Sequence, residues 1–124
     1  MKMTNLEIYS NAQALNQAFE NFNEYLPVKV NFFMQKNIKA IQELAMDIEN
    51  SRVEIIQRYG SLNEETNEFS VPAESIEAAN SELIDLFDIE QEVNIRKISL
   101  DAFGDIKLST DQVQALMFMI EDVE

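Results

Sequence analysis

The chain has no cysteine, no histidine and no tryptophan among its 124 residues. Without cysteine and histidine it has no thiolate nucleophile, no common ligand set for zinc or haem, and no Ser-His-Asp triad. The side chain that most often carries protons near neutral pH is missing as well. We therefore expect a protein that is not an enzyme and that holds neither a metal nor a cofactor.

Carboxylates, hydroxyls, lysine and arginine are what remains for chemistry. The segment Asp105-Ile106-Lys107, with Asp101 close by and Asp88 upstream, has the D-x-K form of magnesium-dependent nucleases. In a chain with 23 acidic residues, however, an acid two positions before a lysine is expected by chance. The same acids lack the spacing of an EF-hand loop, so the sequence predicts neither a nuclease nor a calcium site.

Long hydrophobic runs are also missing, since no apolar stretch approaches the roughly 18 residues that a membrane span needs. The start, Met1-Lys2-Met3-Thr4-Asn5, leads into no hydrophobic signal region. We expect a cytoplasmic protein that does not bind a membrane. Its length favours a single domain over residues 1–124.

Basic residues are few, nine against 23 acids, which gives a net charge of −14. The charge is uneven, because residues 1–60 have a net charge of −1 and residues 61–124 one of −13. From residue 61 to residue 95 there are ten acids and no base. This imbalance disfavours direct binding to nucleic-acid backbones, and it indicates either a solvated acidic face or a charged interaction surface.

Glycine and proline occur twice each, and three of these four residues mark helix boundaries, whereas Gly104 is expected in a turn. Pro27 and Pro72 suit the first turns of helices, and Gly60 suits the end of one. Apolar residues spaced by three and four predict one helix over 28–59. That helix would be roughly 48 Å long, against about 35 Å for the diameter of a compact domain of this size. It must therefore bend, break at Asn50-Ser51, or project.

Three further helices are expected. One runs over 11–25 from a Ser10/Gln13 capping box, one from Pro72 to Phe87, and one from a Ser109/Gln112 capping box to about Glu121. Residues 61–68 are expected as a loop, 69–71 as a brief strand or as an anchor for that loop, and 93–100 as a strand with which 106–108 pairs back. The expected fold class is α+β, predominantly helical, with about four helices, one of them long, and a small antiparallel sheet.

Candidate partner-binding residues lie in three places. On the last helix, the predicted core stripe is Val113, Leu116, Met117 and Ile120. Phe118 falls on the far side, near Asp111, Gln114 and Asp122, so either this helix is covered on two sides or Phe118, together with Met119, meets a partner. Beyond the core, a second chain or the last helix would have to cover Ile55 and Ile56, and the acidic loop offers Glu64, Glu65 and Glu68.

Five basic residues of the long helix, Lys29, Lys36, Lys39, Arg52 and Arg58, allow two interpretations. They could form a strip that binds phosphates, or they could pair with the acidic third helix. The overall charge favours the second. Phe32 and Phe33 are expected in the core rather than as stacking platforms.

Several segments, in their order and spacing, resemble a known group of proteins. They are Leu26-Pro27-Val28-Lys29, Lys36-Asn37, Arg52 to Tyr59-Gly60, Glu92-Val93-Asn94-Ile95, and Ala115-Leu116-Met117-Phe118-Met119-Ile120-Glu121. The group consists of small, uncharacterised, acidic proteins encoded by tailed phages and prophages of low-GC Gram-positive bacteria. The resemblance covers nearly the whole chain and implies a phage context. It carries no catalytic residues.

The sequence thus supports two hypotheses of function. The first is a phage or prophage accessory protein that acts by binding another protein of phage or host, for example in virion assembly, and that could form homo-oligomers. The second is an acidic mimic of nucleic acid that inhibits a host DNA-handling or defence enzyme. A mimic needs carboxylates in a phosphate-like array, which a sequence alone does not reveal.

Overall fold

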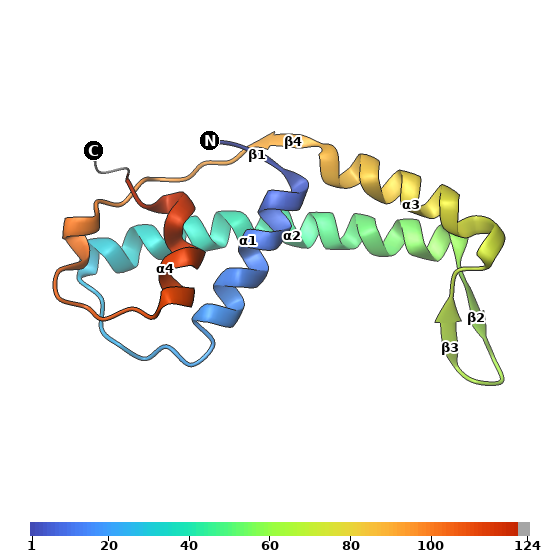
Figure 1. Ribbon diagram of the computed structural model, residues 1–124, viewed down its shortest axis with the longest axis horizontal. Coiled ribbons are helices and arrows are strands. Elements are labelled where there is room, and N and C mark those ends of the chain that lie inside the picture. Colours follow the sequence, from blue (N-terminus) through green and yellow to red (C-terminus); the bar gives the residue numbers. More distant parts are fainter. Residues whose placement is uncertain (122–124) are drawn as a thin grey trace.

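A computed structural model of the chain describes residues 1–121. The long helix α2 (Val28–Tyr59) runs the length of an elongated molecule (Figure 1). Helix α1 (Asn5–Ala18) crosses its middle, α4 (Thr110–Leu116) packs against α1, and α3 (Ala73–Asp88) lies alongside its second half. The expected fold class, α+β and mainly helical with one long helix, is confirmed.

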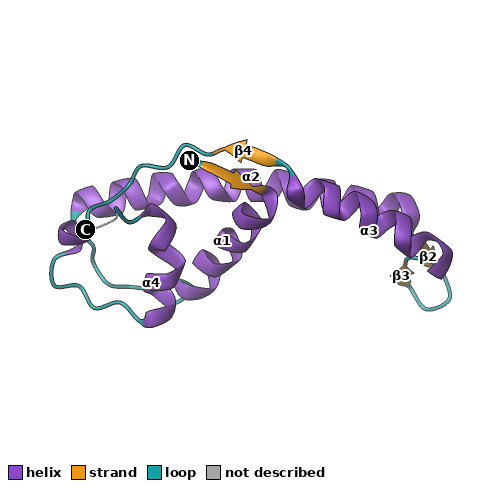
Figure 2. Ribbon diagram, turned by 45° about the horizontal axis from the view of Figure 1, so that its top comes forward, coloured by secondary structure: helices purple, strands orange, loops and turns teal. Residues whose placement is uncertain are grey.

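The strands form two small antiparallel pairs (Figure 2). Strand β1 (Lys2–Thr4) pairs with β4 (Glu90–Glu92), and β2 (Ser61–Asn63) pairs with β3 (Glu68–Ser70). The second pair is a hairpin in which Asn67 adopts a positive φ of 57°. Residues 61–63 were predicted as loop, and the structure corrects this, because Leu62 and Phe69 pair across the hairpin.

Helix α1 begins and ends earlier than the sequence pattern predicted. The side chain of Thr4 accepts a hydrogen bond from the backbone of Glu7, and the Glu7 carboxylate accepts one from the Thr4 backbone. This capping box starts the helix six residues before the expected Ser10 box. Since the helix ends at Ala18, Phe19 to Tyr25 belong to the connection that leads to α2.

Helix α2 is continuous, with no break at Asn50-Ser51. It follows Pro27 and ends at Gly60, as predicted. A Cβ atom at Gly60 would lie 2.5 Å from the ring of Phe69 and 2.9 Å from the carbonyl oxygen of Ile56. Glycine therefore lets the β2–β3 hairpin fold back against the end of the helix.

The predicted strand over 93–100 is wrong. The strand ends at Glu92, and the only pairing beyond it within the described residues is one bridge from Ile98 to Ile120. The buried side chain of Asn37 supplies the hydrogen bonds that the backbone of a neighbouring strand would otherwise make to this segment. It donates to the backbone carbonyl of Arg96 at 2.8 Å and accepts from the Arg96 N–H at 2.9 Å. Residues 106–108 form no strand either.

The last helix starts at the predicted Ser109/Gln112 capping box but ends at Leu116. A 3-10 turn, η2 (Met117–Met119), follows and rotates the chain relative to an ideal α-helix. The Met119 carbonyl then accepts the N–H of Ile98 at 2.7 Å. Of the predicted core stripe, Leu116 is buried and Ile120 is half-buried, whereas Val113 and Met117 are 38% and 61% exposed.

Two parts of the molecule differ in their packing. The main hydrophobic core unites residues of α1, α4, the segment after β4, and α2 as far as Ile48. Within residues 49–88 the only buried apolar residues are Ile55 and Ala79, and both lie outside that core. We call residues 49–88, which comprise the end of α2, the hairpin and α3, the arm, and the rest of the described chain the head.

Candidate protein-binding surfaces

In the C-terminal segment, the structure contradicts the prediction that the side chain of Met119 meets a partner. Its side chain is fully buried in the core, and its sulfur lies 3.6 Å from the amide nitrogen of Asn37. Phe118 is half-buried and packs against the core, so it does not project freely. The 3-10 turn moves Met119 inward and Met117 outward, which no helical projection could anticipate. Asp122, expected beside Phe118, lies outside the described residues.

Ile55 and Ile56 are also placed differently from the prediction. Helix α3 of the same chain packs along this part of α2, so Ile55 is buried and Ile56 is half-buried. No second chain is needed to cover them. Their covering by α3, with Arg58 bonded to Glu82 at 3.0 Å, explains how a helix of this length is stabilised beyond the main core.

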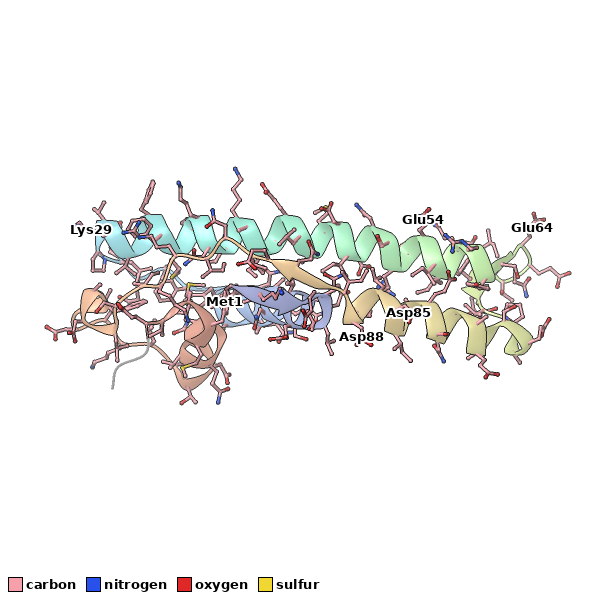
Figure 3. All side chains as sticks on the ribbon, turned by 90° about the horizontal axis from the view of Figure 1, so that it is seen from above. Met1, Lys29, Glu54, Glu64, Asp85 and Asp88 are labelled. Atoms are coloured by element: carbon pink, nitrogen blue, oxygen red, sulfur yellow. The ribbon has the colours of Figure 1, made fainter. Side chains whose placement is uncertain are left out.

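Glu64, Glu65 and Glu68 lie on the β2–β3 hairpin, at the tip of the arm, and all three are exposed. Leu62 and Phe69, on the same hairpin, are 53% and 45% exposed. The structure therefore brings the predicted acidic residues next to exposed apolar ones at the end of the molecule farthest from the head (Figures 1 and 3).

The arm concentrates the negative charge. Residues 49–88 contain ten acids and two bases. Both bases form ion pairs within the arm, Arg52 with Glu49 at 2.6 Å and Arg58 with Glu82 at 3.0 Å. In the described residues, no salt bridge joins a base to any of the other eight acids of the arm, which are Glu54, Glu64, Glu65, Glu68, Glu74, Glu77, Asp85 and Asp88.

The outer side of α3 combines charge with apolar surface. Glu74, Glu77, Asp85 and Asp88 are exposed, and we call them the acidic stripe of α3. Ile76 and Ile84 are 46% and 61% exposed and line a shallow depression along the same helix with Ala73, Glu77, Asn80 and Ser81. An apolar strip bordered by carboxylates is typical of a surface that binds a protein.

The basic residues of α2 divide between the two parts of the molecule. The predicted pairing with the third helix is correct for Arg58 alone. Arg52 pairs within α2, and Lys39 lies 3.9 Å from Glu43 of the same helix. Lys29 and Lys36 belong to the head half of α2, away from α3 (Figures 1 and 3). Phe32 is 54% exposed, contrary to its predicted place in the core, and Phe33 is half-buried.

The most strongly perturbed carboxyl group is structural in character. Glu49 accepts hydrogen bonds from Arg52, at 2.6 and 2.9 Å, and from the hydroxyl of Tyr9, at 2.6 Å. The Arg52 guanidinium and then the Tyr9 hydroxyl lower the pKa of Glu49 to about 2. A carboxylate held so firmly ionised is a poor proton carrier near neutral pH. It clamps α1 to α2 where the arm begins.

Within residues 1–121, no group of three or more acidic, cysteine or histidine side chains is placed to hold a metal ion. Asp101 and Asp105 are exposed on the loop around η1 (Leu100–Phe103). In the same residues, no helix is both long enough and apolar enough to cross a membrane.

Comparisons of the chain with protein-family models, with curated proteins and with solved structures find no match in any of the three.

Proposed function

We propose that this chain is a phage or prophage accessory protein that is not an enzyme and that works by binding another protein through its arm. The observation that carries the proposal is the arm itself. It projects from the core, contains ten acids and two bases, and uses both bases internally. The phage context comes from the sequence resemblance alone.

The surface of the arm defines the kind of partner that would fit. The acidic stripe of α3 would steer a basic surface toward the arm, because charge complementarity raises association rates. Ile76 and Ile84 could then enter apolar pockets, as buried side chains near the centre of an interface supply most of its affinity. The proposed partner is a protein with an apolar patch bordered by lysine or arginine.

Affinity capture from infected host cells tests the proposal. The tagged full chain is compared with an arm variant, Glu74→Gln/Glu77→Gln/Asp85→Asn/Asp88→Asn. A control neutralises four exposed acids of the head, Glu20→Gln/Glu24→Gln/Asp101→Asn/Asp105→Asn. We expect the wild type and the control to retain the same protein and the arm variant to lose it. Retention by the arm variant with loss by the control would place the binding surface on the head.

Inhibition of a DNA-handling enzyme by mimicry is the second candidate function, and the acidic stripe of α3 favours it. The stripe is uneven, however. Glu74 and Glu77 are roughly 4.5 Å apart along the helix axis, as are Asp85 and Asp88, but roughly 12 Å separates the two pairs. Phosphates follow one another at regular intervals of about 3.4 Å per strand. Duplex DNA should release a partner captured through mimicry and should leave a partner of another kind bound.

A further inference from the structure

The head holds a basic groove that the proposed function does not use. It lies where the first half of α2 runs beside the segment that follows β4, and its volume is about 450 Å³. Three cationic side chains, Lys36, Lys39 and Arg96, line it together with Phe33, Asn37, Ala40, Glu43 and Asn94. With one acid against three bases, this groove is a local exception in a strongly acidic chain.

Two of the cations are held in position by aromatic rings. The guanidinium of Arg96 lies 4.3 Å from the ring centre of Phe33, and the ammonium of Lys36 lies 5.2 Å from that of Phe32. The two rings pack edge to face at 5.4 Å. Asn37, which is 1% exposed, fixes the Arg96 backbone through its two hydrogen bonds. Cations that are ordered in advance lose less entropy when they bind an anion.

The three cationic side chains of the groove are also left largely free to bind an anionic group. Lys39 has a loose contact with Glu43 at 3.9 Å, and both side chains are about 70% exposed or more. In residues 1–121, neither Lys36 nor Arg96 forms a salt bridge. The groove therefore presents positive charge that the head itself does not neutralise.

The arm of the same chain does not reach this groove. Helix α3 runs along the second half of α2, where Arg58 bonds Glu82. From Lys39 to Arg58 the continuous helix extends roughly 28 Å at 1.5 Å per residue, and Asp88, six residues after Glu82, lies roughly 9 Å nearer to the head. Roughly 19 Å therefore still separates Lys39 from the nearest acid of the stripe along the helix axis. Figure 1 shows the arm directed away from the head. Contact between the groove and an acidic stripe must therefore join two molecules.

We propose that the basic groove of one copy binds the acidic stripe of α3 of a second copy. Lys36 and Lys39 are three residues apart on a helix, the same spacing as Glu74 and Glu77 and as Asp85 and Asp88. The exposed Phe32 beside the groove matches the exposed isoleucines beside the stripe. Contact between two arms would instead bring like charges together.

The contact is heterologous, because different surfaces of the two copies meet. Such contacts build open chains, or rings where the rotation closes. At physiological salt, charges are screened over about 8 Å, so the groove and the stripe interact locally despite the net charge of each copy. The inference does not rest on the proposed function, since it is tested on the purified chain alone.

Analytical ultracentrifugation of the purified full chain tests the contact. Protein concentrations from about 10 µM to about 1 mM suit a weak association. The mean mass should rise with concentration at about 0.1 M NaCl, and the association should weaken at least about tenfold at about 0.5 M NaCl. Association that strengthens with salt, or a monomer at every concentration, would overturn the proposal.

Charge reversal identifies the surfaces. A groove variant, Lys36→Glu/Lys39→Glu, and an arm variant, Glu74→Lys/Glu77→Lys/Asp85→Lys/Asp88→Lys, should each remain monomeric alone. Mixed together they should associate again, because each groove then meets an arm of opposite charge. The control, Lys2→Glu/Lys107→Glu, changes two exposed lysines outside the groove and should behave as wild type.

Two further outcomes would contradict the assignment. In the first, mixing leaves both variants monomeric although each is folded by circular dichroism, and the contact would then lie elsewhere. Alternatively, inorganic phosphate or ATP could raise the melting temperature of a monomeric wild type but not that of the groove variant. The groove would in that case be a site for small anions rather than for a second copy.

Discussion

At the scale of single residues, Leu116 and Met117 are neighbours in different environments. Leu116 is fully buried, whereas Met117 is 61% exposed. Leu116→Ala should lower the free energy of unfolding by about 2–5 kcal/mol, because it removes buried methyl groups and leaves a cavity. Met117→Ala should lower it by less than about 1 kcal/mol, as surface changes usually do. Urea unfolding measures both, and equal losses would mean that η2 is packed on both sides.

Glu49 predicts a pH dependence of stability. Its pKa in the folded chain is about 2, below the ordinary value of 4.5, because Arg52 and Tyr9 donate hydrogen bonds to the carboxylate. Ionised Glu49 therefore stabilises the fold above pH 4.5, and this contribution is lost as the pH falls toward about 2.

Glu49→Gln removes the titrating group, so its free energy of unfolding should approach that of the wild type as the pH falls from 4.5 toward 2. Urea unfolding at several pH values measures the difference. Glu54→Gln, at an exposed position of the same helix, is the control. A gap between wild type and Glu49→Gln that stays constant over this range would show that the carboxylate is not held by Arg52 and Tyr9.

Side-chain placement was predictable where a helix stays regular and not where it changes type. The three- and four-residue spacing that predicts the helix over 28–59 includes Met34, Ile41 and Ile48, and all three are buried in the core. Helical projection failed at Met117 and Met119, because η2 alters the rotation per residue. The role of Asn37 had no signal in the sequence, since its two hydrogen bonds reach a backbone 59 positions away.

At the scale of elements, the arm should respond to salt. Its eight acids without a salt bridge repel one another, and salt screens exposed charges over about 8–10 Å. Raising sodium chloride to about 0.5 M should therefore raise the melting temperature.

The neutralised arm variant, Glu74→Gln/Glu77→Gln/Asp85→Asn/Asp88→Asn, should melt higher than wild type at low salt and gain less from added salt. Differential scanning calorimetry compares the two. A wild-type melting temperature that is flat or falls with salt would mean that the repulsion within the arm is negligible.

Most helices were predictable because local signals define their ends. Pro27, Gly60, Pro72 and the Ser109/Gln112 box all mark observed boundaries. The start of α1 was misplaced at the Ser10/Gln13 box, whereas in the structure Thr4 and Glu7 form the capping box and Asn5 donates to the carbonyl of Leu86 near the end of α3. The strands were hardest, since each has three residues and depends on a partner distant in sequence or on a tight turn.

At the scale of the whole molecule, the arm makes the chain longer than a compact protein. A compact domain of 124 residues has a radius of gyration of about 14 Å, whereas α2 alone is roughly 48 Å long. Small-angle X-ray scattering of dilute protein in about 0.5 M NaCl should give a monomer with a radius clearly above about 14 Å. A monomer at that compact value would mean that the arm folds back onto the head.

The sequence predicted that the long helix must bend, break or project, but not which. Projection requires a cover for Ile55, and the cover is α3 of the same chain rather than a second copy. The concentration of acids after residue 60 was visible in the sequence. Their separation from the lysines of the head depends on the direction of α3, which only the assembled fold determines.

Cross-linking inside infected cells tests the central claim, that the arm is the surface that binds a partner, most directly. A photo-reactive amino acid replaces either Ile84 on α3 or Leu6 on α1, which are 61% and 56% exposed and so equally accessible. We predict a covalent adduct with a different protein from position 84 and none from position 6. Adducts with a different protein from position 6, and none from position 84, would contradict the claim.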